Sequence, residues 1–581
     1  MRQLFKTKHV SSQSHASSPP SHSKSPSLLD TVHAGSLTIA HVSTHDRLAD
    51  VLTKPLAKSR FTLLRSKLGV SNGSTICGGI LGKNTYSPHQ DLQSATHHLD
   101  LLLVAALAPN IPALYELHFG IPMAGAVISA LNTRLDKVVL AVLLEQLEPK
   151  IIFVDYQFVE VVLQAFDIFS VAKHKLPRLV LIPECDQETS PITRELPPNS
   201  LDYNELLAIG QADFKIIHAN NEYDPISVNY TSGSTGKPKG AVYSHRAAYL
   251  NSFAEIFRSD MRRMPVFLWT VDMFRCNGWG FIWAVAALGG TNICIRNVSA
   301  KVIFDAISLH KVTHFCGAPA ILNKIADAPV GDQKPLPSKV DIMVAGALPP
   351  AQVLNKVEEF GFNVNHAYGM TEALGPTTLW RFDENERIKC REGNHNIMME
   401  GVDVKDPISM ESVPPDGKTI GEVMFRSNTM MLGYLKNLQA TQEAFKGGWY
   451  RTRDLGVIHP DGYIQLKDRA IDMINSGGNT ISTLEVEAVI ISHPNVLEAA
   501  VVGRPDDQLG ETPCAFVKLK EGCNVSAEEI VKFCGERMMH YMTPQTVVFG
   551  DLPVNSTGKI QKFVLREKAK AMGSFPILNG H

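Results

Sequence analysis

The chain has 581 residues, of which 44% are hydrophobic and 20% charged, with a formal net charge of -2. This length exceeds one hydrophobic core and predicts at least two domains, while the near-neutral charge argues against nucleic-acid binding as the main role. Nine cysteines without a C-x-x-C pair favour a reducing compartment over a disulfide framework or a structural zinc site. The longest apolar run, Gly278 to Gly290, is too short to span a membrane and predicts a buried helix.

Residues 1–90 differ in composition from the rest of the chain. Ser11 to Ser27 is rich in Ser, Pro and His and predicts disorder. Because the first acidic residue is Asp30, a transit peptide is one interpretation. Ser36 to Leu56 and Arg60 to Val70 instead resemble the ribonuclease H tail of copia-type retroelement polyproteins. The resemblance covers residues 1–70, and we favour a retroelement-like, low-complexity extension over residues 1–90. Its ribonuclease H carboxylates are not present, and no nuclease activity is expected.

From residue 98 onward the pattern predicts an α/β fold. Apolar runs such as Ile151 to Val154 and Leu179 to Ile182 are bounded by proline and charged residues, as buried strands are. We expect a large domain of layered sheets and helices over residues 98–466 and a small α+β domain over residues 467–575.

The strand predicted at Pro225 to Tyr230 leads into a loop rich in Thr, Ser, Gly and Lys, from Thr231 to Gly240. Glycines let backbone N–H groups approach an anion, and hydroxyls and lysines add donors and positive charge. A Walker A loop would place Ser or Thr after the lysine, whereas Pro238 follows Lys237. We interpret the segment as a phosphate-binding loop of another kind; a flexible linker is the alternative.

Three later segments carry side chains that could bind the other parts of a nucleotide and its metal ion. Tyr368 to Glu372 offers an aromatic ring, a turn glycine and a carboxylate suited to Mg²⁺. Gly448 to Asp454 ends in a carboxylate able to accept hydrogen bonds from two ribose hydroxyls, and Ser556 to Lys559 lies near the C-terminus. In this order, the four segments resemble the adenylate-forming superfamily of acyl-CoA synthetases, luciferases and peptide-synthetase adenylation domains.

Further matches extend the resemblance over about residues 98–575 and indicate plant acyl-activating enzymes: Ala105 to Asn110, Cys276 to Trp279, Gly421 to Arg426 and Val501 to Asp507. The resemblance implies an AMP-forming carboxylic acid:CoA ligase that uses ATP, Mg²⁺ and CoA. It would activate a small aromatic or short- to medium-chain acid as an acyl adenylate, mainly by positioning and charge stabilisation. A catalytically impaired or non-catalytic homologue is the alternative, and a luciferase-like oxygenase is a more distant one.

The resemblance also implies roles for single residues. Glu372 would ligate Mg²⁺, Lys559 would reach the carboxylate and the α-phosphate, and the small domain would rotate about a hinge at Leu466 to Arg469. The catalytic set is Lys559, Glu372 and Thr235. The ATP- and AMP-binding set is Thr231, Ser232, Gly233, Ser234, Thr235, Gly236, Lys237, Gly240, Gly346, Ala347, His366, Ala367, Tyr368, Gly369, Met370, Thr371, Asp454 and Arg469. The acyl-pocket set is Phe274, Arg275, Cys316 and Gly375, and the CoA channel is Gly477 and Gly478.

Each assignment has a simpler alternative. Lys559 alone would be a solvated surface residue, Glu372 a carboxylate at a helix start, and Asp454 the cap of a turn. Tyr368 could be part of the core. The pair Gly477 and Gly478 fits a narrow channel for a thiol or, equally, a tight surface turn.

Several positions depart from the family pattern. Arg275 stands where relatives usually carry a histidine, and Asp272 replaces a usual proline, which adds a negative charge near the path of the acid. Arg453 replaces the glycine before the ribose-binding aspartate; if that position needs a positive φ angle, the side chain costs about 1–2 kcal/mol. Near the hinge, the unusual residues are Ile471, Asn479 and Thr480.

Residues 1–90 do not resemble the helices and strand that close the large domain in the family. We therefore expect the N-terminal part of that domain to be missing. Apolar surface around Leu101 to Leu107 and Leu114 to Val127 is then expected to be uncovered, with reduced stability or solubility. Leu578 to His581 lacks a peroxisomal Ser-Lys-Leu tail, which favours a cytoplasmic location. Neither the acid nor the oligomeric state can be read from the sequence.

Overall fold

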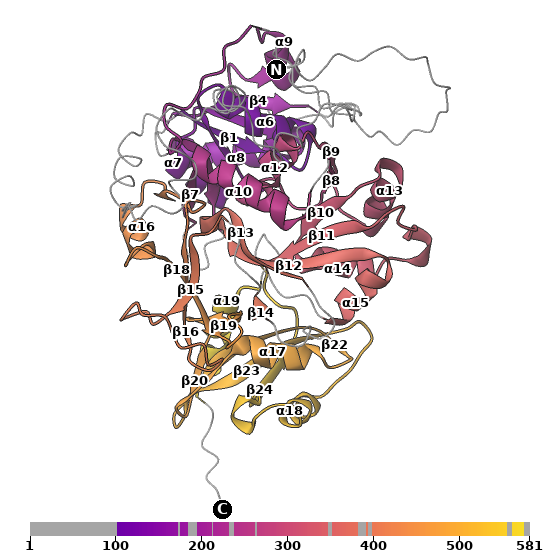
Figure 1. The fold of residues 1–581 in the computed structure, drawn as a ribbon, viewed down its shortest axis with the longest axis vertical. Helices are drawn as coiled ribbons and strands as arrows, with labels where there is room; N and C mark the ends of the chain where they lie inside the picture. Colours follow the sequence, from indigo (N-terminus) through magenta and orange to yellow (C-terminus); the bar gives the residue numbers. More distant parts are fainter. Residues whose placement is uncertain are drawn as a thin grey trace, which may run out of the picture.

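The computed structural model describes residues 102–171, 175–183, 195–211, 213–231, 238–261, 264–346, 351–381, 391–392, 398–554 and 560–574. Within these ranges the strands form four sheets, which follow one another along the chain from the indigo to the yellow end of Figure 1, except that the short strand Gly433–Tyr434 belongs to the first sheet. The mixed α/β fold expected from the sequence is confirmed. The expectations for residues 1–90 lie outside the described residues, and the domain boundaries stay predictions.

The first sheet has eight strands in the order β17-β7-β6-β2-β1-β3-β4-β5. Its strands are β1 (Leu103–Leu107), β2 (Val127–Ala130), β3 (Ile151–Asp155), β4 (Arg178–Ile182), β5 (Leu201–Asp202), β6 (Pro225–Tyr230), β7 (Gly240–Ser244) and β17 (Gly433–Tyr434). From β6 to β5 the neighbours run parallel, whereas β7 is antiparallel to both β6 and β17. The helices of this part are α6 (Pro112–Met123), α7 (Lys137–Leu147), α8 (Val159–Val171) and α9 (Tyr203–Ala208), with η1 (Tyr156–Phe158).

The second sheet has six strands in the order β13-β12-β11-β10-β8-β9. They are β8 (Val266–Trp269), β9 (Thr291–Cys294), β10 (His314–Gly317), β11 (Val340–Ala345), β12 (Phe362–Met370) and β13 (Gly375–Arg381). All pairs are parallel except β12 and β13, which form an antiparallel pair. The helices are α10 (His245–Arg258), α11 (Cys276–Trp279), α12 (Phe281–Ala287), α13 (Ala300–His310), α14 (Pro319–Ala326) and α15 (Ala351–Glu359), with η2 (Val330–Asp332) and η3 (Thr371–Ala373).

The third and fourth sheets lie in the orange and yellow part of Figure 1. The third has the order β14-β19-β18-β16-β15 and consists of β14 (Arg391–Glu392), β15 (Gly401–Lys405), β16 (Gly421–Arg426), β18 (Tyr450–Ile458) and β19 (Ile464–Arg469), with α16 (Leu438–Ala444). The fourth has the order β21-β20-β23-β22, with β24 on β23. Its elements are β20 (Ile474–Ser476), β21 (Asn479–Ile481), β22 (Val496–Asp506), β23 (Gly510–Leu519), β24 (Thr546–Phe549), α17 (Thr483–Ile491), α18 (Ala527–Gly535), η4 (His540–Met542) and α19 (Lys562–Ala571).

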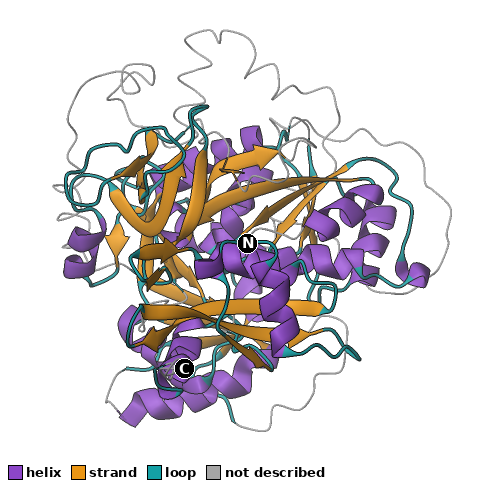
Figure 2. Ribbon diagram, turned by 90° about the horizontal axis from the view of Figure 1, so that it is seen from below, coloured by secondary structure: helices purple, strands orange, loops and turns teal. Residues whose placement is uncertain are grey.

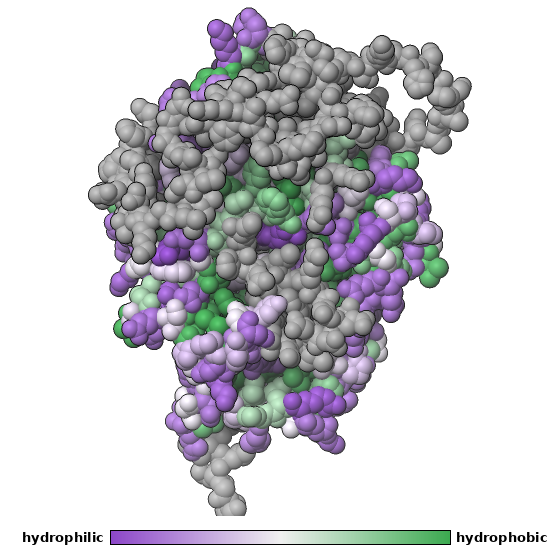
Figure 3. Space-filling model, viewed as in Figure 1, coloured by the Kyte–Doolittle hydropathy of each residue, from purple (hydrophilic) through white to green (hydrophobic). Residues whose placement is uncertain are grey.

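Layers of strands packed against helices bury the apolar residues (Figure 2). Both apolar runs that predict strands lie in β3 and β4, and the segment from Gly278 to Gly290 contains the buried helix α12. No helix in the described ranges is long and apolar enough to cross a membrane. Hydrophilic and hydrophobic residues are mixed on the face of the molecule shown in Figure 3.

The apolar surface of β1 and α6 is covered, which corrects the expectation that it would be exposed. Every residue of β1 is at most 5% exposed, because β1 is an inner strand between β2 and β3. In α6, Leu114 and Leu117 are fully buried in one apolar cluster with Trp269 and Phe281. Leu101 lies outside the described residues and Leu102 is 41% exposed, so the predicted loss of stability has no structural basis at β1 and α6.

Candidate active site

The predicted phosphate-binding loop connects β6 to β7. Tyr230 pairs with Gly240 across the two strands, and Thr231 N donates a 2.9 Å hydrogen bond to Lys239 O. The hairpin therefore brings the two ends of the loop together. The remaining loop candidates lie outside the described residues: Ser232, Gly233, Ser234, Thr235, Gly236 and Lys237.

One end of this loop is connected to the predicted metal ligand. Lys239 Nζ lies 4.5 Å from the centre of the Tyr434 ring, a cation–π geometry. Tyr434 Oη in turn donates a 2.8 Å hydrogen bond to Glu372 Oε1. Burial raises the pKa of the Tyr434 phenol far above its usual value, and the neighbouring Glu372 charge raises it further. Tyr434 thus stays a neutral donor that orients the carboxylate.

Glu372 is also fixed through its backbone. Tyr243 Oη donates to Thr371 O at 2.5 Å, and Met431 N donates to Glu372 O at 2.8 Å. In the described part of the chain no group of three or more His, Cys, Asp or Glu side chains could hold a metal ion. Mg²⁺ is commonly held by one or two carboxylates together with substrate phosphates and water. The anchored Glu372 carboxylate fits this donor set.

Three predicted nucleotide-binding residues meet where β12 of the second sheet approaches β18 and β19 of the third sheet. Tyr368 Oη donates to Asp454 Oδ2 at 2.7 Å, and Arg469 Nε lies 3.4 Å from Asp454 Oδ1. Asp454 and Arg469 face each other in the register of β18 and β19. Asp454 therefore lies within a strand, so the alternative that it caps a turn does not hold. The contact of Tyr368 with adenine stays a prediction.

Arg453, directly before Asp454, has a φ angle of 62°. The condition under which a side chain at this position is costly is therefore met. Arg453 N donates to Glu422 Oε1 at 2.9 Å, and Ala470 N donates to Arg453 O at 3.0 Å. These two bonds hold the left-handed backbone in place beside Asp454.

Replacing Arg453 by glycine is expected to raise the free energy of unfolding by about 0.5–1 kcal/mol. Glycine removes the strain of the left-handed backbone in the folded state, but it also increases the conformational entropy of the unfolded chain, which offsets part of the gain. Urea denaturation of the purified chain measures the change. Arg453→Ala is the matched control, since alanine also lacks the long side chain but keeps the strain. Equal stability of the two variants would show that the backbone angle carries no cost.

Gly369 lies where β12 and β13 approach each other most closely. A Cβ atom at Gly369 would be 2.0 Å from the carbonyl oxygen of Gly375, which is backbone and has no rotamer by which to move away. Gly375, an acyl-pocket candidate with φ 107°, in turn lies against Trp279. The hairpin thus joins the predicted nucleotide site to the predicted acyl pocket.

Gly369→Ala is expected to lower the free energy of unfolding by about 2–4 kcal/mol, since two strands must separate to admit one methyl group. A thermal or urea unfolding experiment measures this loss. Gly331→Ala is the control, because nothing lies within 4 Å of a Cβ at Gly331. A variant at Gly369 as stable as the one at Gly331 would contradict the packing described here.

The Cys276–Trp279 segment adopts left-handed backbone angles at every residue, with φ of 46°, 45°, 58° and 53°. Such angles cost roughly 1–2 kcal/mol at each non-glycine residue. Buried hydrogen bonds offset this cost: Asn277 N donates to Asn229 Oδ1 at 3.0 Å, and Ser227 Oγ donates to Asn277 Oδ1 at 2.7 Å. Cys276 Sγ lies 3.4 Å from Thr371 Oγ1, so the segment is held against the predicted nucleotide site.

The unusual residues Asp272 and Arg275 pair with each other. Arg275 Nε donates to Asp272 Oδ2 at 2.9 Å, and Arg134 donates to both oxygens of the same carboxylate, at 2.9 and 3.2 Å. Both guanidinium groups lie within 6 Å of the centre of the Phe274 ring. The negative charge of Asp272 is therefore balanced, and the two departures from the family pattern are coupled.

The other acyl-pocket and adenine candidates belong to the second sheet or its loops. Cys316 is a buried residue of β10, and His366 and Ala367 are buried in β12. Gly346 follows β11 with φ 100°, and Ala347 lies outside the described residues. Met370 ends β12 directly before Thr371.

In the small C-terminal part, Lys559 lies outside the described residues, but the chain around it is well anchored. Gln561 N donates to Pro553 O at 2.8 Å, which closes the loop that contains Lys559. Lys562 Nζ lies 2.8 Å from Glu487 Oε1 and donates to Thr483 Oγ1 at 2.5 Å. Thr483 Oγ1 donates onward to Asp468 Oδ2 at 2.5 Å, so the base of the lysine loop is connected to the predicted hinge.

Gly477 and Gly478 form the two-residue turn between β20 and β21. Ser476 pairs with Asn479, and both glycines have positive φ, 56° and 81°, as tight hairpin turns require. The alternative of a tight turn therefore describes this segment. A role of the turn in a thiol channel stays a prediction.

Sequence reasoning missed Tyr434, Asn229, Ser227 and Asn277 as residues of the site. Asn277 lies in the Cys276 to Trp279 match, and Ser227 and Asn229 lie in the strand before the loop, but the contacts between them join segments about 50 residues apart in the sequence. Their burial between strands would have been the available signal.

Comparison with known proteins identifies the class. Residues 100–435 match the model of the AMP-binding enzyme family, and residues 485–559 match that of the AMP-binding enzyme C-terminal domain. The chain belongs to this family of AMP-binding enzymes.

Curated relatives narrow the comparison to CoA ligases. A peroxisomal butyrate–CoA ligase of Arabidopsis thaliana is 46% identical over 490 residues, which cover 81% of this chain and 84% of the relative. A 2-methylpropanoate–CoA ligase of Humulus lupulus is 44% identical over 486 residues, which cover 81% of this chain and 86% of the relative. A peroxisomal trans-cinnamate:CoA ligase of Petunia hybrida is 42% identical over 520 residues, which cover 86% of this chain and 90% of the relative.

A solved structure shares the fold. The o-succinylbenzoate CoA synthetase of Bacillus subtilis, in complex with an acyl-adenylate intermediate, has a TM-score of 0.69 and 23% identity, covering 83% of this chain and 91% of the other. At 23% identity, this similarity shows that the two chains share a fold.

Proposed function

We propose that the chain is an AMP-forming carboxylic acid:CoA ligase that activates a small aromatic or short- to medium-chain acid and transfers it to CoA. The observation that carries the proposal is the Tyr368–Asp454–Arg469 cluster, together with the link from Lys239 through Tyr434 to Glu372. The CoA-ligase relatives support the same reaction.

In the first half-reaction a carboxylate oxygen of the acid attacks the α-phosphorus of ATP, and pyrophosphate leaves. The loop from Thr231 to Gly240 would hold the departing phosphates. Mg²⁺, held by Glu372, would neutralise charge on the phosphate oxygens. Asp454 and Arg469 would orient the ribose. Lys559 would stabilise the charge that builds up at the α-phosphate in the transition state.

In the second half-reaction the CoA thiol attacks the acyl carbon, the bond to the phosphate oxygen breaks, and AMP leaves. The turn at Gly477 and Gly478 would line the path of the thiol after the small domain has rotated. Phe274, Arg275, Cys316 and Gly375 would enclose the acyl group, with Gly346 to Ala347 and His366 to Tyr368 beside the adenine.

Acid-dependent exchange of labelled pyrophosphate into ATP tests the first half-reaction on the full chain. A panel of butyrate, 2-methylpropanoate, octanoate, benzoate and cinnamate is expected to contain at least one acid that supports exchange, and that acid should form a CoA thioester. Absence of exchange with every acid, in a chain that still binds ATP, would favour the non-catalytic homologue.

Two finer proposals concern the compartment and residues 1–70. A cytoplasmic location is proposed, although several CoA-ligase relatives are named as peroxisomal. The likeness of residues 1–70 to a retroelement polyprotein stays a proposal about the origin of that segment. Imaging of the full chain with an internal tag tests the first, and comparison of genomic and transcript sequences tests the second.

A further inference from the structure

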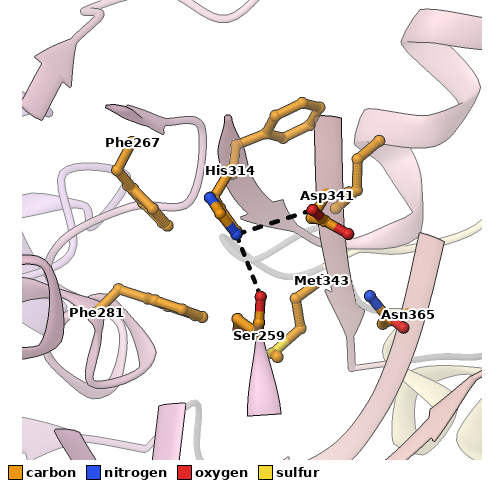
Figure 4. Close-up of a pocket in the computed structure, with 9 residues that line it drawn as sticks. Ser259, Phe267, Phe281, His314, Asp341, Met343 and Asn365 are labelled. Atoms are coloured by element: carbon orange, nitrogen blue, oxygen red, sulfur yellow. Dashed lines mark hydrogen bonds and ion pairs between the residues drawn. The ribbon is translucent and has the colours of Figure 1, made fainter. Parts of the chain in front are cut away.

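The small cavity in Figure 4 is not lined by predicted site residues. Its walls come from the second sheet, from α12 and from the end of α10, and it has room for about one water molecule. Phe267, Phe281, His314 and Asp341 are among the lining residues. Further residues that act in the site are therefore found among the direct contacts of the predicted site residues.

The segment from Met431 to Leu435 runs between the predicted metal ligand and the predicted phosphate-binding loop. At one end, Met431 N donates a 2.8 Å hydrogen bond to Glu372 O. At the other end, Leu435 N donates to Gly240 O at 2.7 Å, where β7 begins. One short segment thus fixes the backbone of Glu372 relative to the strand that leaves the loop.

The Tyr434 side chain, in the same segment, makes the link a second time. Its Oη donates a 2.8 Å hydrogen bond to Glu372 Oε1, and Lys239 Nζ lies 4.5 Å from the centre of its ring. Lys239 directly precedes Gly240 in the sequence. Among the described residues, Tyr434 alone donates a side-chain hydrogen bond to the Glu372 carboxylate. The ring therefore has the lysine on its face and the carboxylate at its hydroxyl group.

Burial keeps the Tyr434 ring in this position. Tyr434 is 3% exposed and belongs to one apolar cluster with Tyr243, Phe425 and Tyr450. A buried phenol needs a hydrogen-bond partner, so rotation of the ring away from Glu372 would lose that bond together with the lysine contact. Glu372 itself is only partly buried. One carboxylate oxygen is thus fixed by Tyr434, and the other is left for a cation.

We propose that Tyr434 is a positioning residue, which holds the Glu372 carboxylate in place for the Mg²⁺ that accompanies ATP and keeps it aligned with the phosphate-binding loop. This rests on the proposed CoA-ligase function. Removal of a group that orients a metal ligand through a hydrogen bond typically lowers metal affinity about 10- to 100-fold. AMP has neither a β- nor a γ-phosphate, so its binding should not depend on Tyr434.

Tyr434→Phe tests the proposal, because it keeps the ring and its lysine contact and removes only the hydroxyl group. Calorimetry on the full chain measures the binding of ATP with and without Mg²⁺, and the binding of AMP. At limiting Mg²⁺ the affinity for ATP is expected to fall about 10- to 100-fold, and saturating Mg²⁺ should restore most of it. The affinities for AMP and for ATP without Mg²⁺ should change little.

Tyr203→Phe is the matched control. Tyr203 is 4% exposed, and its Oη donates a hydrogen bond of the same length, 2.8 Å, to Glu116 Oε2. Neither residue belongs to the predicted site. The control therefore removes the same kind of buried bond and should leave the Mg²⁺ dependence of ATP binding unchanged, even where it lowers the free energy of unfolding.

A second pair of variants shows whether Tyr434 acts through Glu372. Glu372→Gln removes the carboxylate charge and should itself weaken the Mg²⁺ dependence of ATP binding. Addition of Tyr434→Phe to this variant should then have little further effect, because no carboxylate remains to be positioned. A full additional loss in the double variant would show that Tyr434 acts by another route.

Unchanged Mg²⁺ dependence in Tyr434→Phe would overturn the proposal. Equal losses of ATP and AMP binding would also overturn it, since they indicate general damage to the fold, as would the same Mg²⁺ effect in Tyr203→Phe. If the chain binds ATP in a Mg²⁺-dependent way but turns over no acid, the proposed function fails, and these binding measurements still decide the role of Tyr434. ATP binding that does not respond to Mg²⁺ in the original chain would refute this role directly.

Discussion

Replacement of Lys559 by alanine is expected to slow acyl-adenylate formation by about 10²–10³-fold, as removal of a charge-stabilising donor does in other enzymes. Gln561 N donates to Pro553 O, so the described residues on either side of Lys559 are held together directly before the start of α19. A single-turnover measurement of AMP-linked product from ATP and acid isolates this step. The transfer of a synthetic acyl adenylate to CoA should change much less, because the proposed rotation of the small domain would have removed the lysine from the site.

Lys568→Ala is the matched control, since Lys568 is an exposed lysine of α19, the helix that follows Lys559 in the sequence. It should leave both half-reactions unchanged. Equal loss of both steps in the Lys559 variant would mean that the substitution damages the fold, and unchanged adenylation would remove Lys559 from the mechanism.

Lys562→Met is expected to lower the free energy of unfolding of the C-terminal part by about 3–5 kcal/mol, because it leaves the buried Glu487 carboxylate without its cation. The Lys562 and Glu487 side chains are 15% and 11% exposed and lie 2.8 Å apart. Burial raises the pKa of the Glu487 carboxyl, and the Lys562 charge lowers it. The loss of unfolding free energy is measured by chemical denaturation, with the hydrogen exchange of the amides in α17 and α19 as the local probe.

Two controls accompany this variant. Lys568→Met, on the exposed face of α19, should cost little. The double variant Lys562→Met with Glu487→Leu should recover much of the lost stability, since the unpaired charge is then gone. If the double variant is no more stable than Lys562→Met alone, the pair does not stabilise this part of the chain.

Local sequence patterns predicted the strands well, because a strand is an alternation or an apolar run within a few residues. The strand expected at Pro225 to Tyr230 has these bounds in the structure, and the run from Leu179 to Ile182 lies within β4. The positive φ angle at Arg453 could also be anticipated from the sequence, because the resembled family usually has glycine at this position.

Contacts between distant segments could not be predicted in this way. Tyr434 reaches Glu372 because β17 pairs with β7 at the edge of the first sheet. In the sequence, Glu255 and Arg258 look like an ordinary exposed ion pair three residues apart on an amphipathic helix. Their burial depends on the sheet against which this helix packs. The burial of β1 likewise depends on its two neighbouring strands.

The pairing of Asp272 with Arg275 changes how the departures from the family pattern are understood. Taken singly, Arg275 replaces a usual histidine and Asp272 adds a negative charge near the path of the acid. Together with Arg134 they form a bonded cluster that balances the carboxylate, which is compatible with an active enzyme. Proposals of impaired function should therefore rest on activity measurements of the full chain.

The fate of the carboxylate oxygens tests the central claim most directly. The acid that supports pyrophosphate exchange is prepared with heavy oxygen in its carboxylate and incubated with the chain, ATP, Mg²⁺ and CoA, and the nucleotide product is analysed by mass spectrometry. An acyl adenylate leaves one labelled oxygen on AMP when the thiol attacks the acyl carbon, and this is the predicted result. Unlabelled AMP, or label in inorganic phosphate together with ADP, would contradict the account.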